Sequence, residues 1–192
     1  LKQLLGYSGF TVCLLAAPLA LGAGASGEAI GFTCAGCHGT DGESQGSVPS
    51  LKGEDAETLK EMLMDYKTDK DEGTVMNRIA KGYTDEEIKA MSEFYAALPF
   101  VSAADKQKFD ADKIKQGSKL YKKNCSKCHD EKGALADDDA GILAGQWLPY
   151  LTYSMEDFTS GKREMPKKMA KKVEKLDSFD IDALMHFFAS QQ

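Results

Sequence analysis

The 192-residue sequence contains no apolar run of the ~20 residues that a helix needs to cross a bilayer, so we expect no membrane span. It also lacks an excess of positive charge, because 24 Lys and Arg face 30 Asp and Glu, for a formal net charge of −6. A nucleic-acid binder needs a basic surface that neutralises phosphates, and we therefore expect no nucleic-acid partner. Strand-like alternation of apolar and polar residues is absent as well, which leaves helices as the expected elements.

Helix signals occur at several places along the chain. Thr84 to Glu87 form a capping box, and the apolar stripe that follows ends at Pro99. A second stripe with helical spacing starts at Ile181, and a further helix is expected from about Asp112. The connections are long and rich in Gly, Asp and Lys, which is unusual for a compact helical domain unless something other than side chains fills the core. The sequence therefore predicts an all-α protein with a non-protein component in its core.

The cysteines show a duplication. Cys34–His38 and Cys125–His129 both read C-x-x-C-H and lie 91 positions apart. Further matches follow each motif, since Leu51 and Gly53 of the first half correspond to Leu143 and Gly145 of the second. Each half is long enough for three or four helices, so the chain is expected to consist of two tandem domains.

C-x-x-C-H is the attachment signature of c-type haem. Two thiols on one helical turn can form thioethers with both haem vinyl groups, and the adjacent His is then carried to the iron. A redox-active C-x-x-C pair would normally occur once, next to a strand, and a zinc site rarely suits an exported protein. We therefore expect two covalently bound haem c groups, attached at Cys34, Cys37, Cys125 and Cys128, with His38 and His129 as iron ligands.

The sixth iron ligands have to include methionine. The sequence has three histidines, so both irons cannot take two each, and methionine is the usual alternative. Met76 and Met165 each follow a charged, turn-like segment at a similar distance from the haem-binding His, and we favour them as ligands, with Met169 as the rival for the second iron. His186 is interpreted as a surface residue. Five other methionines are interpreted as packing residues: Met62, Met64, Met91, Met155 and Met185.

Residues around the iron ligands are also suggested by spacing. A ligating His normally donates its free ring N–H to a carbonyl, and Pro49 is placed to accept from His38 and Gly141 from His129. An aromatic pool that could reach haem propionates, or simply pack, consists of Tyr66, Tyr83, Trp147, Tyr150 and Tyr153.

The expected organisation has three parts. Residues 1–25 form a secretory leader, with a positive charge at Lys2, a mostly apolar stretch and a small-residue cleavage site, and Cys13 is expected to leave with it. Residues 26–103 form the first haem domain and residues 104–192 the second. Export of the processed chain predicts a periplasmic protein.

The two-motif, two-methionine plan resembles the dihaem cytochromes c, which are built from two class I cytochrome c folds. Within that group the sequence most resembles the cytochrome subunits of flavocytochrome c sulfide dehydrogenases. The resemblance covers essentially residues 28–192, and the departure from it is the acidic stretch Asp65–Gly73. The segments that carry it are Cys34–Thr40, Val75–Tyr83, Ile142–Leu151, Met165–Lys171 and Phe188–Gln192.

The resemblance implies a role as an electron-transfer subunit without substrate chemistry of its own. An FAD-containing sulfide dehydrogenase subunit would form a heterodimer with this chain and pass electrons to its haems, and a soluble cytochrome-type acceptor would receive them. The resemblance also supports Met76 and Met165 as iron ligands. No glycine-rich nucleotide-binding motif is present, so we expect no flavin on this chain.

Two other functions fit the motifs. One is a free-standing dihaem electron carrier without a flavoprotein partner, and the other is a dihaem peroxidase, which would need an open sixth position on one iron. Residues 27–103 carry 7 basic and 15 acidic side chains, a net charge of −8, whereas residues 104–192 carry 16 and 15, a net charge of +1. This asymmetry would steer the two halves toward different partners, or it serves solubility alone.

Overall fold

A computed structural model describes residues 24–136 and 140–192. Apart from Gly24 and Ala25, the predicted leader with Cys13 lies outside these residues. The described elements are all helical, which confirms the predicted fold class, and none of these helices is long and apolar enough to cross a membrane. The α-helices are α1 (Gly27–Gly31), α2 (Ala35–His38), α3 (Ala56–Lys67), α4 (Met76–Ala80), α5 (Asp85–Ala96), α6 (Ala111–Asn124), α7 (Leu148–Ser160), α8 (Lys167–Val173) and α9 (Ser178–Ala189).

Side-chain caps fix where several of these helices begin. The predicted capping box opens α5: the Glu87 N–H donates to Thr84 Oγ1 at 3.2 Å, and the Thr84 N–H donates to Glu87 Oε2 at 2.8 Å. Asp110 accepts from the first backbone N–H groups of α6, so this helix begins at Ala111, close to the predicted start. Each such cap contributes about 1 kcal/mol to helix stability.

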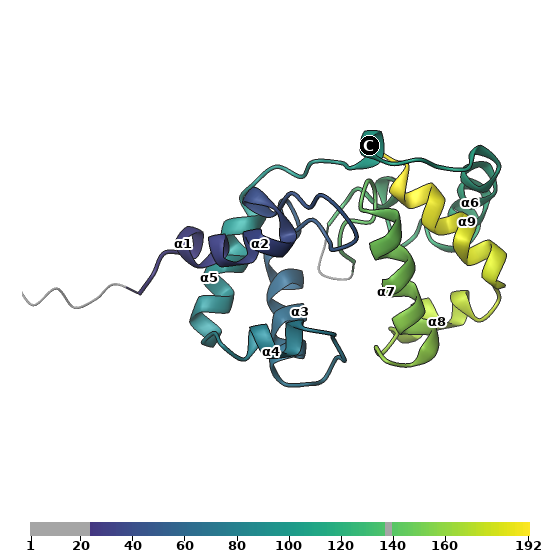
Figure 1. Ribbon diagram of the computed structural model, residues 1–192. Coiled ribbons are helices and arrows are strands. Elements are labelled where there is room, and N and C mark those ends of the chain that lie inside the picture. Colours follow the sequence, from purple (N-terminus) through teal and green to yellow (C-terminus); the bar gives the residue numbers. More distant parts are fainter. Residues whose placement is uncertain (1–23, 137–139) are drawn as a thin grey trace, which may run out of the picture.

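The helices form two groups that follow one another along the chain (Figure 1). In the first group α1 packs on α5, and in the second α6 packs on α9. Both crossings have a glycine at the contact: a Cβ on Gly27 would lie 2.2 Å from the Ala90 carbonyl oxygen, and one on Gly117 would lie 2.2 Å from that of Ala183. The two halves therefore bring their first and last helices together in the same way.

The apolar cores of both halves are small. The buried cluster of the first half consists of Ile30, Ile88 and Met91, with half-buried side chains around it. The second half has a larger cluster of seven buried residues, which includes Tyr121 and five residues of α9. Cores of this size are thin for domains of 80–90 residues, in agreement with the expectation that another component completes them.

Gly53 and Gly145 confirm the correspondence between the halves. Each N–H donates to the end of the last helix of its own half, Gly53 to the Tyr95 carbonyl and Gly145 to the Phe188 carbonyl, both at 2.9 Å. Their φ values of +77° and +69° are in the left-handed region, which favours glycine. The turn after each cysteine motif is therefore attached to its C-terminal helix by the same bond.

The halves are joined by a linker and by an interface. The short 3₁₀ helix Ala104–Lys106 lies in the linker between α5 and α6, where the expected boundary at residue 103 falls. Across the interface, Gln146 pairs with the Ser50 backbone, accepting from its N–H at 3.0 Å and donating to its carbonyl at 2.9 Å. The buried Glu54 carboxylate accepts from the Ile142 N–H at 2.9 Å. Glu54 and Gln146 follow the matched glycines directly, so the interface has an approximate two-fold relation.

Candidate haem-binding sites

The first cysteine motif lies in a short helical segment. Cys34 occupies the N-cap of α2 and is half-buried, while Cys37 lies within the helix and is exposed. Neither forms a disulfide. A spacing of three residues places both thiols on one side of a helix, as attachment to a single haem requires.

His38 is oriented by the carbonyl that the sequence predicted. The side chain is buried, and its Nδ1 lies 2.9 Å from the Pro49 carbonyl oxygen. Because a carbonyl can only accept, Nδ1 carries the proton and Nε2 remains for a metal. Burial lowers the pKa of the imidazole, although the bond to Pro49 opposes this, and the neutral ring is the form that binds iron.

The second motif forms a helical turn at the end of α6. The Cys125 N–H donates to the Tyr121 carbonyl at 2.9 Å, and the His129 N–H donates to the Cys125 carbonyl at 3.0 Å. The Tyr121 hydroxyl donates to the His129 carbonyl and accepts from the Lys132 N–H, both at 2.8 Å. Burial raises the pKa of the Cys125 thiol to about 11. The bond expected from the His129 ring N–H to the Gly141 carbonyl stays a prediction. Residues 137–139, which precede Gly141, lie outside the described part of the chain.

The favoured methionines both lie near the start of a short helix. Met76 is the first residue of α4, and Met165 precedes Pro166, which caps α8. Both side chains are half-buried, as is the rival Met169 within α8. Their role as iron ligands stays a prediction. The packing interpretation is confirmed for Met91 and Met185, which are 2% and 4% exposed.

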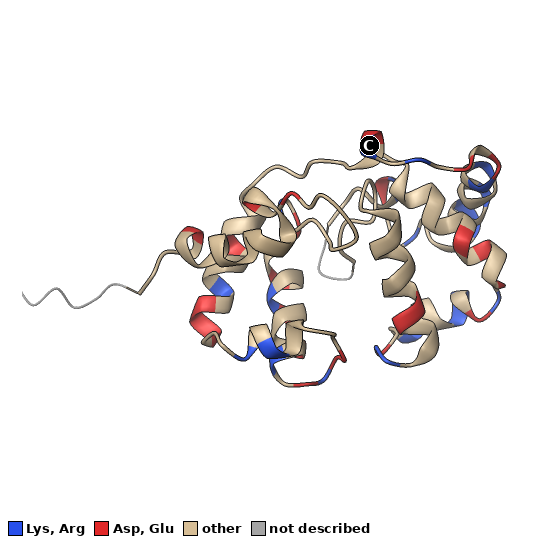
Figure 2. Ribbon diagram, viewed as in Figure 1, with Lys and Arg blue, Asp and Glu red and all other residues tan. Residues whose placement is uncertain are grey.

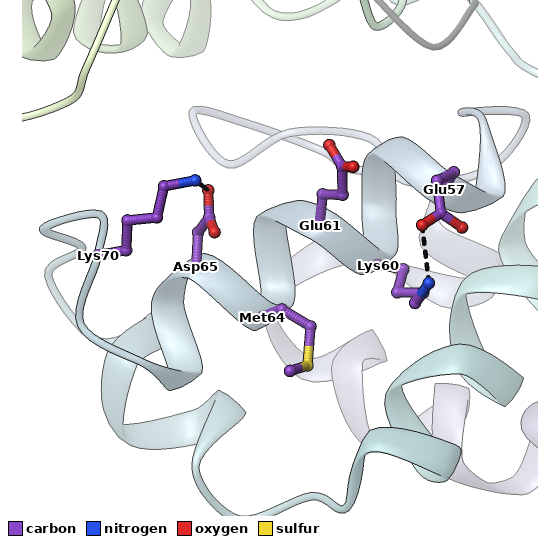
Figure 3. A pocket seen from close by; sticks show the side chains of 6 residues that line it. All are labelled: Glu57, Lys60, Glu61, Met64, Asp65 and Lys70. Carbon is purple, nitrogen blue, oxygen red and sulfur yellow. Dashed lines mark hydrogen bonds and ion pairs between the residues drawn. The ribbon is translucent and has the colours of Figure 1, made fainter.

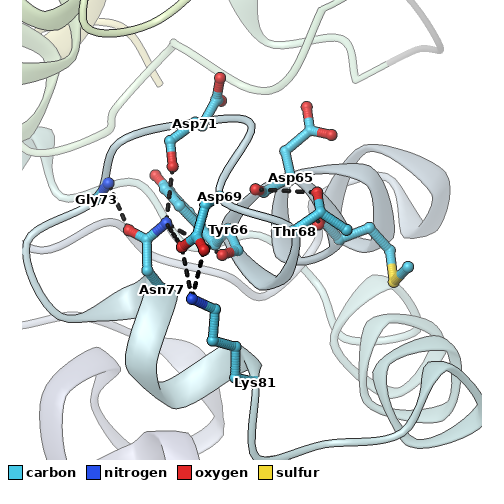
Figure 4. A network of polar contacts seen from close by, with 9 residues as sticks. Asp65, Tyr66, Thr68, Asp69, Asp71, Gly73, Asn77 and Lys81 are labelled. Carbon is cyan, nitrogen blue, oxygen red and sulfur yellow. Dashed lines mark hydrogen bonds and ion pairs between the residues drawn. The ribbon is translucent and has the colours of Figure 1, made fainter.

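The acidic stretch before Met76 is organised around Asn77 (Figure 4). The Asn77 Oδ1 accepts from the Gly73 N–H at 2.6 Å, and its Nδ2 donates to the carbonyls of Tyr66 and Asp71 at 3.1 and 2.8 Å. Asp69 extends the network through an ion pair with Lys81 at 2.5 Å. This acidic loop is therefore held to the same helix that begins with Met76. Sequence reasoning missed Asn77, although its position directly after the favoured ligand was a signal.

A shallow hollow of about 320 Å³ lies beside α3 and is lined by charged groups and Met64 (Figure 3). Two of its lysines are already paired, Lys60 with Glu57 at 2.7 Å and Lys70 with Asp65 at 2.8 Å. Met64 itself packs against the first-half core. The hollow is therefore a charged surface feature of α3.

One residue differs from its sequence interpretation, and another makes a contact that the sequence did not indicate. His186 is not a free surface residue, because its side chain is only 12% exposed and its Nδ1 accepts from the Asp110 N–H at 3.3 Å. Burial lowers the pKa of this histidine. Trp147 uses its indole N–H across the interface, donating to the Ser44 carbonyl at 3.0 Å. Sequence spacing within one half could not reveal a partner in the other half.

The residues present fit a covalent haem in each half. Each motif supplies two thiols and one imidazole, and His38 is oriented by a backbone carbonyl. Among residues 24–136 and 140–192, no group of three or more His, Cys, Asp and Glu side chains is arranged to hold a metal ion directly. The small apolar cores, with half-buried Cys34, Leu63 and Met64 beside the first, suit a large flat apolar group.

Sequence comparisons with known families agree with this reading. A family described as "Cytochrome c" matches residues 25–98, and one described as "Cytochrome C oxidase, cbb3-type, subunit III" matches residues 112–187. The two matches cover the two cysteine motifs separately. Each half is therefore a cytochrome c domain.

Similar individual proteins include a cytochrome subunit of sulfide dehydrogenase from Chlorobaculum tepidum, 46% identical over 72 residues. That match spans 38% of this chain and 66% of the relative. A cytochrome c4 from Pseudomonas aeruginosa is 27% identical over 181 residues, 88% of each chain. The crystal structure of reduced cytochrome c4 from Pseudomonas stutzeri superposes with a TM-score of 0.76 at 23% identity, over 86% of this chain and 97% of that one. The structural likeness shows the same two-domain fold.

Proposed function

The chain belongs to the cytochrome c family as a dihaem electron-transfer protein, and we propose that it relays electrons from a flavoprotein sulfide dehydrogenase subunit to a soluble acceptor. The observation that carries this proposal is the 46% identity to the cytochrome subunit of a sulfide dehydrogenase. Oxidation of sulfide to zero-valent sulfur releases two electrons, and two haem sites can accept one each. The flavin and the sulfide chemistry belong to the partner, and the pair works in the periplasm.

In this proposal each domain holds its haem with four side chains. Cys34 and Cys37 would attach the first haem and Cys125 and Cys128 the second, while His38 and His129 would bind the irons. Met76 and Met165 would supply the second protein ligand of each iron, and residues 26–103 and 104–192 would be the two domains. Haem c supplies one-electron chemistry at its iron, and a methionine ligand raises its reduction potential relative to a second histidine. Pro49 holds the neutral ring of His38 in place during electron transfer.

The charge distribution supports different contacts for the two domains (Figure 2). The helix α8 carries four lysines within seven residues, and Lys122 and Lys123 lie in the last turn of α6. The first domain carries its excess of acidic residues on α3, α5 and the loop before α4. Such opposite surfaces raise association rates with partners of complementary charge and make these rates sensitive to salt.

A second candidate function is a free-standing dihaem carrier. Cytochromes c4 support it, because the relative from Pseudomonas aeruginosa matches 88% of this chain, whereas the sulfide dehydrogenase relative matches 38%. Both candidates use the same haem sites. They differ only in whether a flavoprotein binds this chain.

Purification of the native protein under mild conditions separates the candidates. We expect FAD to co-migrate with the haem through size exclusion at one flavin for two haems, and high salt to weaken the complex. Haem without flavin, at the mass of the single chain, would support the free-standing carrier and contradict the flavoprotein relay.

The ligand assignment has its own test in the isolated holoprotein. Met76→Ala and Met165→Ala are each expected to remove the thioether-to-iron absorbance band from one haem and to lower the reduction potential of that haem. Met169→Ala is the matched control and should leave both bands in place. If Met169→Ala lost one band while Met165→Ala kept both, Met169 would be assigned as the ligand of the second iron in place of Met165. A haem that lacks a sixth ligand before any substitution would favour a peroxidase.

A further inference from the structure

One ion pair joins the two loops that precede the favoured methionines. Arg163 Nε lies 3.2 Å from Asp71 Oδ2, and the two side chains are 23% and 10% exposed. Asp71 lies in the loop before α4, and Arg163 lies in the loop between α7 and α8. Figure 1 shows these loops pointing toward one another at the same end of the molecule. Low exposure distinguishes this pair from the ion pairs of the open surface, which contribute little.

Arg163 is held firmly within the second domain. Its guanidinium carbon lies 4.5 Å from the centre of the Phe158 ring, and its Nη1 donates to Ser154 Oγ at 3.4 Å. The Arg163 N–H also donates to the Asp157 carbonyl at 3.1 Å. Three contacts therefore fix the residue to the C-terminal turns of α7. Met165 follows two positions later.

Asp71 is held equally firmly within the first domain. Its carbonyl accepts from Asn77 Nδ2 at 2.8 Å, and its N–H donates to the Asp65 carbonyl at 3.3 Å. Asn77 follows Met76 directly in α4, so the network of Figure 4 connects Asp71 to the helix that begins with this methionine. The polar contacts therefore run from Arg163 in the Met165 loop through Asp71 to Asn77, the residue that follows Met76.

We propose that Asp71 and Arg163 are a pair of positioning residues that fix the two methionine loops against one another, so that loosening one loop weakens methionine binding at both haems. The proposal rests on Met76 and Met165 as iron ligands. Neither charged group touches an iron in this account. They act by restricting the loops, because a partly buried pair that loses one member leaves a poorly solvated charge behind and the loop rearranges to reach water.

The test compares Asp71→Asn, Arg163→Gln and the double variant with the wild-type holoprotein. Displacement of the iron-bound methionines at alkaline pH is followed by the two ligand-methyl NMR signals of the reduced protein and by the thioether-to-iron absorbance of the oxidised protein. Met76→Ala and Met165→Ala assign each signal to one domain. Lys113→Gln is the matched control, because Lys113 pairs with Asp182 at 2.6 Å with both side chains 42% exposed.

We expect Arg163→Gln to raise the displacement equilibrium of the first-domain methionine, and Asp71→Asn that of the second, by a factor of about 3 to 10, as for coupled neighbours. In the double variant, the displacement equilibrium at each haem should not exceed that of the more affected single variant. Lys113→Gln should show the wild-type equilibria. Effects confined to the substituted domain, adding up in the double variant, would overturn the proposal.

A second readout does not depend on the ligands. If Met76→Ala and Met165→Ala leave both signals in place, the ligand assignment fails, and hydrogen exchange then tests the pair alone. Asp71→Asn is expected to speed amide exchange in residues 161–165, in the domain that carries no substitution. Unchanged exchange in that segment would overturn the positioning role.

Discussion

Glu54 offers a sharp test of how the two domains are joined. The side chain is 8% exposed, and its carboxylate accepts from the N–H groups of Ile142 at 2.9 Å and Asp55 at 3.1 Å. Gln146 occupies the equivalent place in the second domain and makes the equivalent bond to Ser50 at 3.0 Å. The molecule therefore already contains a carboxamide that performs the task of this carboxylate.

The expected costs follow from what each substitution leaves unpaired. Glu54→Ala strands the buried N–H of Ile142, and an unsatisfied buried group costs about 1–3 kcal/mol of unfolding free energy. Gln146→Ala strands both the N–H and the carbonyl of Ser50, so its cost should be about 2–4 kcal/mol. Glu54→Gln keeps an acceptor for Ile142 and should change stability by less than about 1 kcal/mol.

The contribution of Glu54 to the unfolding free energy depends on pH, and the direction of this dependence follows from its pKa. Burial raises the pKa of Glu54, although bonds from Ile142 and Asp55 oppose this. A carboxyl whose pKa is higher in the folded than in the unfolded chain adds most stability below its unfolded pKa, and this contribution is lost as pH rises through the folded pKa. Glu54→Gln does not titrate. Its stability relative to wild type should therefore increase across that window.

Guanidinium unfolding of the holoprotein, followed by circular dichroism from acid to neutral pH, measures both effects. The interpretation would be refuted if Glu54→Gln were as destabilising as Glu54→Ala. It would also be refuted if the relative stability of Glu54→Gln declined as pH rose.

Two further predictions concern the domains themselves. Gly117→Ala should cost about 2–3 kcal/mol of unfolding free energy, because the added Cβ would meet the Ala183 carbonyl oxygen at 2.2 Å and α6 would be forced away from α9. Gly46→Ala, with nothing within 4 Å of the added Cβ, is the control and should stay within about 0.5 kcal/mol of wild type by thermal denaturation. Replacing Cys125 and Cys128 with serine should lower the covalently bound haem, measured after acid extraction, from two to one per chain. Two haems retained would contradict attachment at these thiols.

The all-helical fold and the duplication could be predicted from the sequence because their signals are local. The capping box at Thr84 and the start of α6 depend on neighbouring residues, and the structure has both where expected. The Pro49 carbonyl was predictable because it lies in the same half as His38, a fixed number of residues beyond the motif.

Contacts between the halves could not be predicted in the same way. The bonds of Gln146, Trp147 and Arg163 reach residues about 90 to 100 positions away, and no periodicity in one half indicates which residue of the other lies opposite. The interpretation of His186 as a surface residue was wrong for a related reason. Its exposure depends on the turn before α6, which covers it from outside its own helix.

The central claim is that electrons from sulfide enter this chain through a flavoprotein partner, and haem reduction on addition of sulfide tests it most directly. In the natively purified complex, the haem absorbance should change to the reduced form at the rate of flavin turnover, with both haems reduced. The isolated chain under the same conditions should be reduced far more slowly. Equal rates with and without the flavoprotein, or no reduction in the complex, would contradict the account.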